Sequence, residues 1–353
     1  MKTRKKTRQI KIGDVLIGGN APIVIQSMNN TKTADVEATL AQLRALKTAG
    51  CQIGRLAVPD QESAEALKKI IPESPLPLVA DIHFDHRLAL TSIKNGIQAL
   101  RINPGNIGSE EKVKAVIDAA KEKNIPIRIG INGGSLEKDL LLKYGNTAEA
   151  IVESALREAA VFEKYRFESV KISVKSSSVP KTVAAYKLLS AKVDYPLHLG
   201  VTEAGTLLKG SIKSALGIGI LLYEGIGDTI RVSLTGDPVQ EVVIAKEILK
   251  DLGLREEGIE LISCPTCGRT KVDLETMVTA VEDRLKDFTP SRPLTVAVMG
   301  CEVNGPGEAR EADYGIACGK GQGLLFKEGE VIGKYREDTI VDILVREIRR
   351  NES

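Results

Sequence analysis

Three cysteines in the last hundred residues have the types and the spacing of metal ligands. Cys264 and Cys267 form a C-x2-C pair, and Cys301 begins the stretch CEVNGPGEAR. Such a pair can hold one metal ion or one corner of an iron–sulfur cluster. Three soft ligands leave a four-ligand centre one short, so the identity of the fourth ligand decides what the centre can do.

Two soft-metal centres are compatible with these cysteines. A structural zinc site would recruit Cys318 as a fourth thiolate and be closed. A 4Fe-4S cluster could instead take three cysteines and leave one iron for a weaker ligand or for a substrate. The Asn-Gly-Pro-Gly turn after Cys301 brings Glu308 back as a possible oxygen ligand, which favours the cluster in part. Cys318 lies in a predicted strand, where a reduced core thiol is the commoner role, and Cys51 is predicted to serve packing.

Basic side chains recur in short apolar runs rich in Ile, Val and Leu. They are Arg55, Arg101, Arg128, Lys175 and Arg231. If these runs are barrel strands, their C-terminal ends face one mouth and the cations converge there. Phosphate or diphosphate is the expected ligand, because guanidinium forks match paired phosphate oxygens. The alternative is that each cation pairs with an acidic neighbour or extends along the barrel wall.

Other polar side chains accompany the cations. Those that could orient a ligand by hydrogen bonding are Asn103, Asn132 and Ser233. Glu203, in HLGVTEAG, could deliver a proton beside a bound diphosphate or only balance the nearby cations. Asp81 and His83 close one run and His198 lies within another. We give both histidines low weight, because a lone buried histidine is more often a satisfied core residue.

The elements that must position these residues repeat one unit, an amphipathic segment followed by an apolar run. The runs span 22–28, 53–58, 77–83, 99–105, 126–133, 169–175, 196–205 and 229–236. Such alternation predicts a parallel sheet, and eight units in about 250 residues indicate an α/β fold of the (β/α)8 TIM-barrel type. An open doubly wound sheet is the alternative. Gly50 is expected to cap the first helix, and a hairpin around Gly13 to cover the bottom of the barrel.

The pattern and the use of cysteine both change near residue 255. We therefore predict two domains, a diphosphate-binding barrel over residues 1–254 and a smaller α+β cluster domain over residues 255–353. The smaller domain is expected to contain a helix in DLETMVTAVEDRLKDF, strands in LTVAVMG and YGIACG, and a closing helix from about Asp338.

Composition excludes several classes of function. With 49 basic and 47 acidic residues, a net charge of +2, no Trp and 3% aromatic residues, the chain has no signature of nucleic-acid binding. No apolar run approaches the roughly 18 residues that a transmembrane helix needs. The basic segment MKTRKKTRQIK leads into no apolar region, so it is interpreted as a solvated arm and not a secretory signal. Five cysteines without such a signal indicate reduced thiols in the cytoplasm.

Seven motifs, in this order, resemble the family of 4-hydroxy-3-methylbut-2-en-1-yl diphosphate synthases of the methylerythritol phosphate route. They are IQSMNNTKTADVEAT, VADIHFD, ALRINPGNIG, IRIGINGGSL, HLGVTEAG, SCPTCGRT and MGCEVNGPGEA. The motifs extend from near residue 25 to beyond residue 310, so the resemblance covers nearly the whole chain. Its form is the bacterial two-domain one, since no further domain is inserted.

The resemblance implies a reaction and a cofactor. The family reductively opens 2-C-methyl-D-erythritol 2,4-cyclodiphosphate and removes a hydroxyl group, using two electrons from flavodoxin or ferredoxin. One 4Fe-4S cluster per chain would be held by Cys264, Cys267, Cys301 and Glu308, with the glutamate giving way to substrate. Glu203 matches the acidic residue proposed for proton delivery.

The resemblance also assigns substrate-binding residues. Those that match the family are Arg55, Arg101, Arg128, Asn132, Lys175, Arg231 and Ser233, and Asn304 lies beside the cluster. A homodimer is implied, with each active site between the barrel of one subunit and the cluster domain of its partner.

Two rival functions remain open to test. One is a phosphate-handling barrel aldolase or isomerase with a zinc-stabilised appendage, for which Glu308 would be dispensable. The other is an iron- or redox-sensing binding protein without catalysis.

Overall fold

The computed structural model describes residues 1–134, 136–301 and 305–352. The chain divides into two compact units, Met1–Leu254 and Arg255–Ser353. Among the described residues, no helix is both long and apolar enough to cross a membrane.

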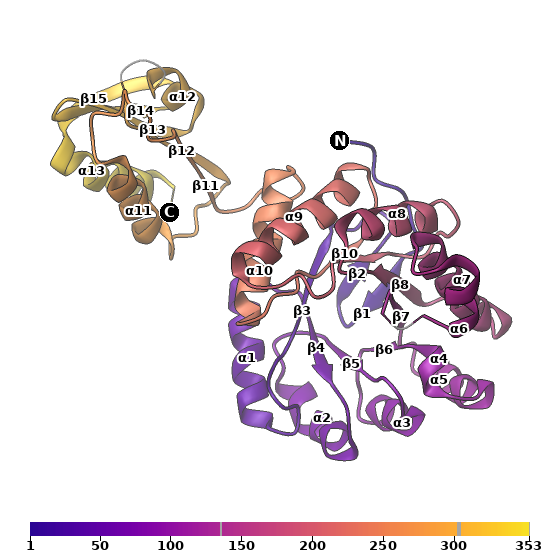
Figure 1. Ribbon diagram of the computed structural model, residues 1–353. Coiled ribbons are helices and arrows are strands. Elements are labelled where there is room, and N and C mark those ends of the chain that lie inside the picture. Colours follow the sequence, from indigo (N-terminus) through magenta and orange to yellow (C-terminus); the bar gives the residue numbers. More distant parts are fainter. Residues whose placement is uncertain (135, 302–304, 353) are drawn as a thin grey trace. The chain divides into compact units, whose positions relative to one another are not determined.

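The first unit is a parallel eight-stranded barrel (Figure 1). Its strands are β3 (Val24–Met28), β4 (Ile53–Ala57), β5 (Leu78–Asp81), β6 (Ala99–Ile102), β7 (Ile127–Asn132), β8 (Val170–Lys175), β9 (His198–Leu199) and β10 (Thr229–Ile230). The hydrogen-bonded order runs from β8 back to β3 and then through β10 to β9. A bridge between Ile172 and Leu197 joins the two ends of this order. The barrel expected from the eight apolar runs is confirmed, although the last two strands are shorter than their runs.

Helices surround the barrel. They are α1 (Val36–Ala49), α2 (Gln61–Glu73), α3 (His86–Lys94), α4 (Pro104–Ile107), α5 (Glu110–Glu122), α6 (Lys138–Tyr144), α7 (Ala148–Lys164), α8 (Val179–Ser190), α9 (Leu207–Tyr223) and α10 (Pro238–Asp251). Local sequence sets their ends. The Asp35 carboxylate accepts the Ala38 N–H at the start of α1, and Gly50 ends the helix as expected, at φ 102°.

A short hairpin closes the N-terminal end of the barrel. Strands β1 (Ile10–Ile12) and β2 (Val15–Ile17) pair antiparallel, and their buried isoleucines pack against Val24, Ile53, Val79 and Ala99. The predicted cover is therefore confirmed.

The expectation of a solvated basic arm is wrong. Arg4 forms an ion pair with buried Asp228 at 2.7 Å, and the Lys5 ammonium donates to the carbonyl of Val193 at 2.6 Å. The side chain of Arg8 pairs with Asp194 at 2.9 Å. The positive charges of this segment thus find acceptors on the barrel, which holds the segment in place.

The second unit has a five-stranded mixed sheet with a helix pair on one face and a short helix on the other. Its elements are β11 (Ile259–Ser263), α11 (Leu274–Leu285), β12 (Leu294–Met299), α12 (Gly305–Glu311), β13 (Tyr314–Gly319), β14 (Gln322–Lys327), β15 (Glu330–Arg336) and α13 (Glu337–Asn351). Strands β11, β12 and β13 are parallel, and β13, β14 and β15 form an antiparallel meander. The α+β class and the four elements expected here are confirmed.

Candidate active site

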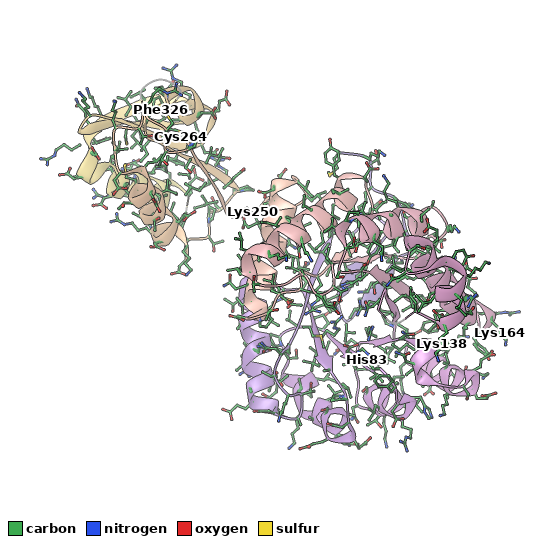
Figure 2. All side chains as sticks on the ribbon, viewed as in Figure 1. His83, Lys138, Lys164, Lys250, Cys264 and Phe326 are labelled. Carbon is green, nitrogen blue, oxygen red and sulfur yellow. The ribbon has the colours of Figure 1, made fainter. Side chains whose placement is uncertain are left out.

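A cavity of about 140 Å³, open to solvent on one side, lies at the C-terminal end of the barrel. Its lining residues are Arg55, Asp81, His83, Arg101, Arg128, Asn132, Ser173, Lys175, Thr202, Arg231 and Ser233. The five cations that the sequence placed at strand ends therefore share one cavity. Asn132 and Ser233 lie there too, as does His83, which is labelled within the barrel in Figure 2.

One buried carboxylate, that of Asp81, organises one side of the cavity. Its Oδ1 accepts a hydrogen bond from Arg101 Nη1 at 3.1 Å, and its Oδ2 lies 3.8 Å from Arg55 Nε. Burial opposes the ionisation of Asp81, but Arg55, His83 and Arg101 outweigh that effect and hold its pKa far below the usual range. Asp81 is therefore a permanent anion that neutralises part of the surrounding positive charge.

A second carboxylate, that of Glu241 on α10, holds Arg231. Arg231 Nη2 and Nε donate to its two oxygens at 3.2 and 3.3 Å. The Ser27 hydroxyl and the Leu234 N–H each donate to Glu241 at 3.0 Å. Arg231 is therefore fixed by a carboxylate that is itself fully bonded.

Among the described residues, no carboxylate lies within ion-pair distance of Arg128 or Lys175. Arg128 Nη1 donates to the Ser173 hydroxyl at 3.1 Å. Burial and the charges of Arg55 and Arg101 lower the pKa of Arg128 well below its usual value. Burial, followed by repulsion from Arg128 and Arg231, does the same to the pKa of Lys175. Burial also lowers the pKa of Arg55, to about 10. The protonated forms of these three side chains are therefore disfavoured in the barrel, and a bound anion would stabilise them.

Two glycines leave room for these cations. A Cβ at Gly130 would lie 2.7 Å from Arg101 Nε, and a Cβ at Gly200 would lie 2.6 Å from Lys175 Nζ. The absence of side chains at these two positions is what lets the long cationic side chains lie across the barrel interior.

Several other residues singled out in the sequence lie elsewhere. Glu203 follows β9 with φ 53° and is exposed; its neighbour Thr202 lines the cavity, whereas Glu203 does not. Asn103 is buried at the start of α4. His198 is a fully buried core residue, as expected, with Nδ1 2.7 Å from the Thr229 hydroxyl.

Sequence reasoning gave no role to Asp81, Ser173, Thr202 or Glu241. Asp81 carried a usable signal, because a carboxylate that ends a barrel strand points to the same mouth as the cations. Glu241 carried none, since it lies in the first turn of α10, ten residues after the arginine that it binds.

The cysteine segments of the second unit meet at one end of its sheet. The Gly300 N–H donates to Cys264 Sγ at 3.4 Å, and the Lys271 N–H donates to the Gly300 carbonyl at 3.1 Å. Cys264 packs against the small cluster that contains Phe326 (Figure 2). The exposed thiol of Cys267 has a lowered pKa, chiefly because the backbone N–H of Arg269 stabilises the thiolate, and it senses the charge of Cys301.

The donor set fits a soft-metal centre in its chemistry and in its location. Glu308 is exposed in the first turn of α12, four residues after the undescribed segment 302–304 that follows Cys301. Asn304 belongs to that segment and lies outside the described residues. Within the described residues, no three His, Cys, Asp or Glu side chains are gathered closely enough to hold a metal ion. The structure brings the two cysteine segments close together. Among the described residues it does not show a complete set of metal ligands in position.

Cys318 has a different environment. It is fully buried in the core that contains Leu274, Val281 and Ile340, on the α11 and α13 side of the sheet. Met299 and Ala317 belong to the core cluster that contains Ala309 of α12, and the partly buried Cys264 packs against both clusters. Burial raises the pKa of the Cys318 thiol to about 12. Burial likewise raises the pKa of the Cys51 thiol, to about 11. Both environments are those of packing thiols.

Comparison with protein families gives two adjacent matches. Residues 7–246 match the GcpE TIM-barrel domain, and residues 260–350 match the GcpE protein C-terminal domain. A relative from Maridesulfovibrio salexigens is 62% identical over 339 residues, which cover 96% of this chain and 94% of that protein. One from Caldanaerobacter subterraneus subsp. tengcongensis is 58% identical over 351 residues, covering 99% and 98%. Both are named 4-hydroxy-3-methylbut-2-en-1-yl diphosphate synthase (flavodoxin).

Solved structures resemble the chain in fold alone. A truncated 3-deoxy-D-arabino-heptulosonate 7-phosphate synthase from Thermotoga maritima superposes with a TM-score of 0.51 at 14% identity, covering 70% of this chain and 91% of that chain. Dihydropteroate synthase from Yersinia pestis gives a TM-score of 0.50 at 13% identity, with coverages of 70% and 99%. The two family models together extend over nearly the whole sequence, and the relatives match it from end to end. The chain therefore belongs to the GcpE family.

Proposed function

We propose that this chain is an oxidoreductase that converts 2-C-methyl-D-erythritol 2,4-cyclodiphosphate into 4-hydroxy-3-methylbut-2-enyl diphosphate and water, for isoprenoid biosynthesis. The conversion consumes two electrons and two protons. The observation that carries the proposal is the convergence of five cations on one cavity in a chain whose full-length relatives bear this enzyme name. The aldolase or isomerase alternative is not favoured, because no such name accompanies these relatives.

The cavity supplies charge and orientation for a diphosphate. Five cations and two carboxylates, Asp81 and Glu241, leave an excess of three positive charges if every group is ionised. A diphosphate compensates this excess, and guanidinium groups can bind its oxygens in pairs. Asn132 and Ser233 line the same cavity and can fix the orientation of the ligand by hydrogen bonding. Residues 1–254 are thus proposed as the substrate domain.

The role of Glu203 depends on how the loop after β9 lies when substrate is bound. We propose that Glu203 delivers a proton to the leaving hydroxyl group. Its exposure makes it accessible to protons from solvent, and its neighbour Thr202 touches the cavity. Replacement by Gln would remove the proton and keep the shape of the side chain.

Residues 255–353 are proposed to bind one 4Fe-4S cluster through Cys264, Cys267, Cys301 and Glu308. Such a cluster, when bound, supplies electrons one at a time at low potential, which side chains cannot do. The thiolate-favouring surroundings of Cys267 support this ligand set, and the complete burial of Cys318 among side chains of α11 and α13 supports a packing role for that thiol. Asn304 is proposed to lie beside the cluster.

Electron donor, location and assembly complete the proposal. The relatives are named for flavodoxin, so flavodoxin, with ferredoxin as a substitute, is the proposed donor. A cytoplasmic location would keep the five thiols reduced. We also propose a homodimer in which each barrel receives the cluster domain of the partner subunit.

One face of α9 supports the homodimer. Leu208, Ile212, Leu216, Ile220 and Tyr223 follow helical spacing and are between 42% and 75% exposed. Monomers rarely expose apolar patches larger than about 300–600 Å². A two-fold axis across the centre of α9 would cover the stripe with its own copy. Such a two-fold interface is isologous, so both copies would contribute the same apolar stripe.

The activity is tested by anaerobic turnover of the cyclodiphosphate with dithionite or reduced flavodoxin. We expect a brown protein with about four iron and four sulfide per chain, and product formation that Arg128→Met reduces by at least 100-fold without loss of iron. Arg157→Met is the matched control, because Arg157 is an exposed arginine paired with Asp139. A colourless zinc protein, or an iron-loaded protein without turnover, would overturn the proposal.

A further inference from the structure

Beneath the cavity, the barrel interior contains a buried lysine that substrate binding as described above does not use. Lys171 of β8 is 2% exposed. Among the described residues, its ammonium has one hydrogen-bond partner, Gln26 Oε1 of β3 at 3.5 Å, and no carboxylate within ion-pair distance. A buried lysine is normally paired with a carboxylate at a shorter distance.

The charges that face Lys171 are mostly positive. Arg128 is its register partner on β7, and Arg55 adds to the repulsion. Asp228 is a carboxylate that favours the ammonium form, but it is already bonded to Arg4 at 2.7 Å and to Thr7 at 3.0 Å. The imidazole of His198, on β9, also senses the charge of Lys171.

A small space adjoins the amine. Gln26, Arg128 and Lys171 line it together with apolar residues that include Ile10 and Ile12, and its volume is about 10 Å³, room for roughly one water molecule. Two buried donors nearby, Gln26 Nε2 and Arg128 Nε, have no partner among the described residues. Unpaired buried donors normally bind ordered water, so a water here would connect Lys171 with the arginine above it.

Burial, and secondly repulsion from the charge of Arg128, lower the pKa of Lys171 well below its usual value. A diphosphate among the five cations would offset the positive potential that opposes protonation, because Coulomb interactions are strong over short distances in a poorly solvated interior.

We propose that Lys171 takes up a proton from solvent when a multiply charged anion occupies the cavity above it, so that anion binding is coupled to proton uptake at the barrel floor. The inference rests on the proposed function in one respect, that the cavity binds a diphosphate. Lys171 is a positioning residue in this scheme, since its charge acts on the ligand through Arg128.

The proposed coupling predicts the direction in which anion affinity changes with pH. Anion affinity should fall as pH rises through the range between the free and the bound pKa of Lys171, by up to about tenfold per pH unit for one linked proton. Lys171→Met fills nearly the same volume without the amine, so it should remove this contribution and leave that of Lys175 in place.

The experiment is calorimetric titration of the full chain with inorganic pyrophosphate, in two buffers of different ionisation enthalpy at each pH. We expect wild type to take up as much as one proton per pyrophosphate more than Lys171→Met. His198→Gln removes the neighbouring imidazole and so tests whether that group takes up the proton. We expect it to behave as wild type. Equal proton uptake by wild type and Lys171→Met overturns the inference while leaving the function intact. Failure of wild type to bind pyrophosphate instead overturns the proposed diphosphate site.

A second measurement follows the amine directly. Lys171 and Lys175 are both buried, so in the full chain labelled with 15N-lysine the buried Nζ signal that remains in Lys175→Arg belongs to Lys171, and this signal should shift from amine to ammonium when pyrophosphate is added. If Lys171→Met does not fold, this spectrum decides the matter, and an amine that persists in the complex contradicts the coupling.

Discussion

Arg101 donates a hydrogen bond to Asp81 across 3.1 Å, from a neighbouring strand of the barrel, and both residues are 6% exposed. The same carboxylate lies 3.8 Å from Arg55 on the other side. One buried anion thus holds two arginines from two further strands in the substrate cavity.

Replacing that anion should destabilise the free protein more than the complex. Asp81→Asn leaves two guanidinium groups without their carboxylate, and breaking a buried pair typically costs about 3–5 kcal/mol. We expect a lower melting temperature and an unusually large recovery when pyrophosphate is added, because the ligand replaces the missing negative charge. Thermal unfolding with and without pyrophosphate measures both effects. Asp118→Asn, which breaks an exposed pair on α5, is the control and should change neither.

A methyl group at Gly130 should displace Arg101. Its Cβ would lie 2.7 Å from Arg101 Nε and 3.0 Å from Nη2. We expect Gly130→Ala to raise KM for the cyclodiphosphate by about 10–100-fold, the loss of one to two charge-assisted contacts. Steady-state kinetics measure this. Gly134→Ala adds the same atom four residues on, where nothing lies within 4 Å, and a comparable rise there would refute the steric explanation.

Glu158 should make stability depend on pH near neutrality. Burial, then the charge of Glu137, raises the pKa of this carboxyl on α7 to about 7. Because the folded pKa is above the unfolded one, its contribution is fully present below about pH 4.5 and is lost as pH rises through about 7. Glu158→Gln should therefore match wild type at pH 4 and be more stable at pH 8, by on the order of 3 kcal/mol.

Denaturant unfolding at the two pH values gives the difference. The control is Glu153→Gln, on the same helix and within 4.0 Å of Arg157. A stability difference between wild type and Glu158→Gln that does not vary with pH would show that the carboxyl titrates normally.

The apolar face of α9 should determine oligomeric state. Placing charges in its centre, with Leu216→Lys and Ile220→Lys together, should convert a dimer into a monomer, because two copies would bury unpaired ammonium groups. Analytical ultracentrifugation of the full chain provides the readout. Leu142→Lys alters an 89% exposed leucine on α6 and should leave the dimer unchanged. A wild-type monomer, or a double variant that still dimerises, excludes this interface.

Iron content should separate the two candidate fourth ligands. Cys318→Ala should keep about four iron per chain, since its thiol lies in the α11 and α13 core. Cys264→Ala should lose the cluster, whereas Glu308→Ala should retain part of the iron, because oxygen is the weakest ligand of the set. Iron and sulfide analysis with the visible spectrum checks all three. Loss of iron in Cys318→Ala, with retention in Glu308→Ala, would instead assign the fourth position to Cys318.

The sequence by itself determined the barrel and the location of its cations. Buried parallel strands have an apolar composition that can be read directly, and the C-terminal ends of such strands share one mouth. Arg55, Arg101, Arg128, Lys175 and Arg231 were therefore predictable as a group, as were the two cysteine segments by their spacing.

Only the tertiary structure decided which groups oppose those cations. Asp81 and Glu241 reach their arginines because barrel closure and the packing of α10 bring distant segments within hydrogen-bond distance. Side chains alternate between the faces of a strand, so Cys318 lies with Tyr314 and Ile316 in the α11 and α13 core, whereas Ala317 lies on the α12 side. For the same reason Lys171, four residues before Lys175, occupies the barrel floor beneath it. The spacing of residue types is local and can be read along the chain. The hydrogen-bond partners and the burial of a side chain depend instead on which strands pair when the barrel closes.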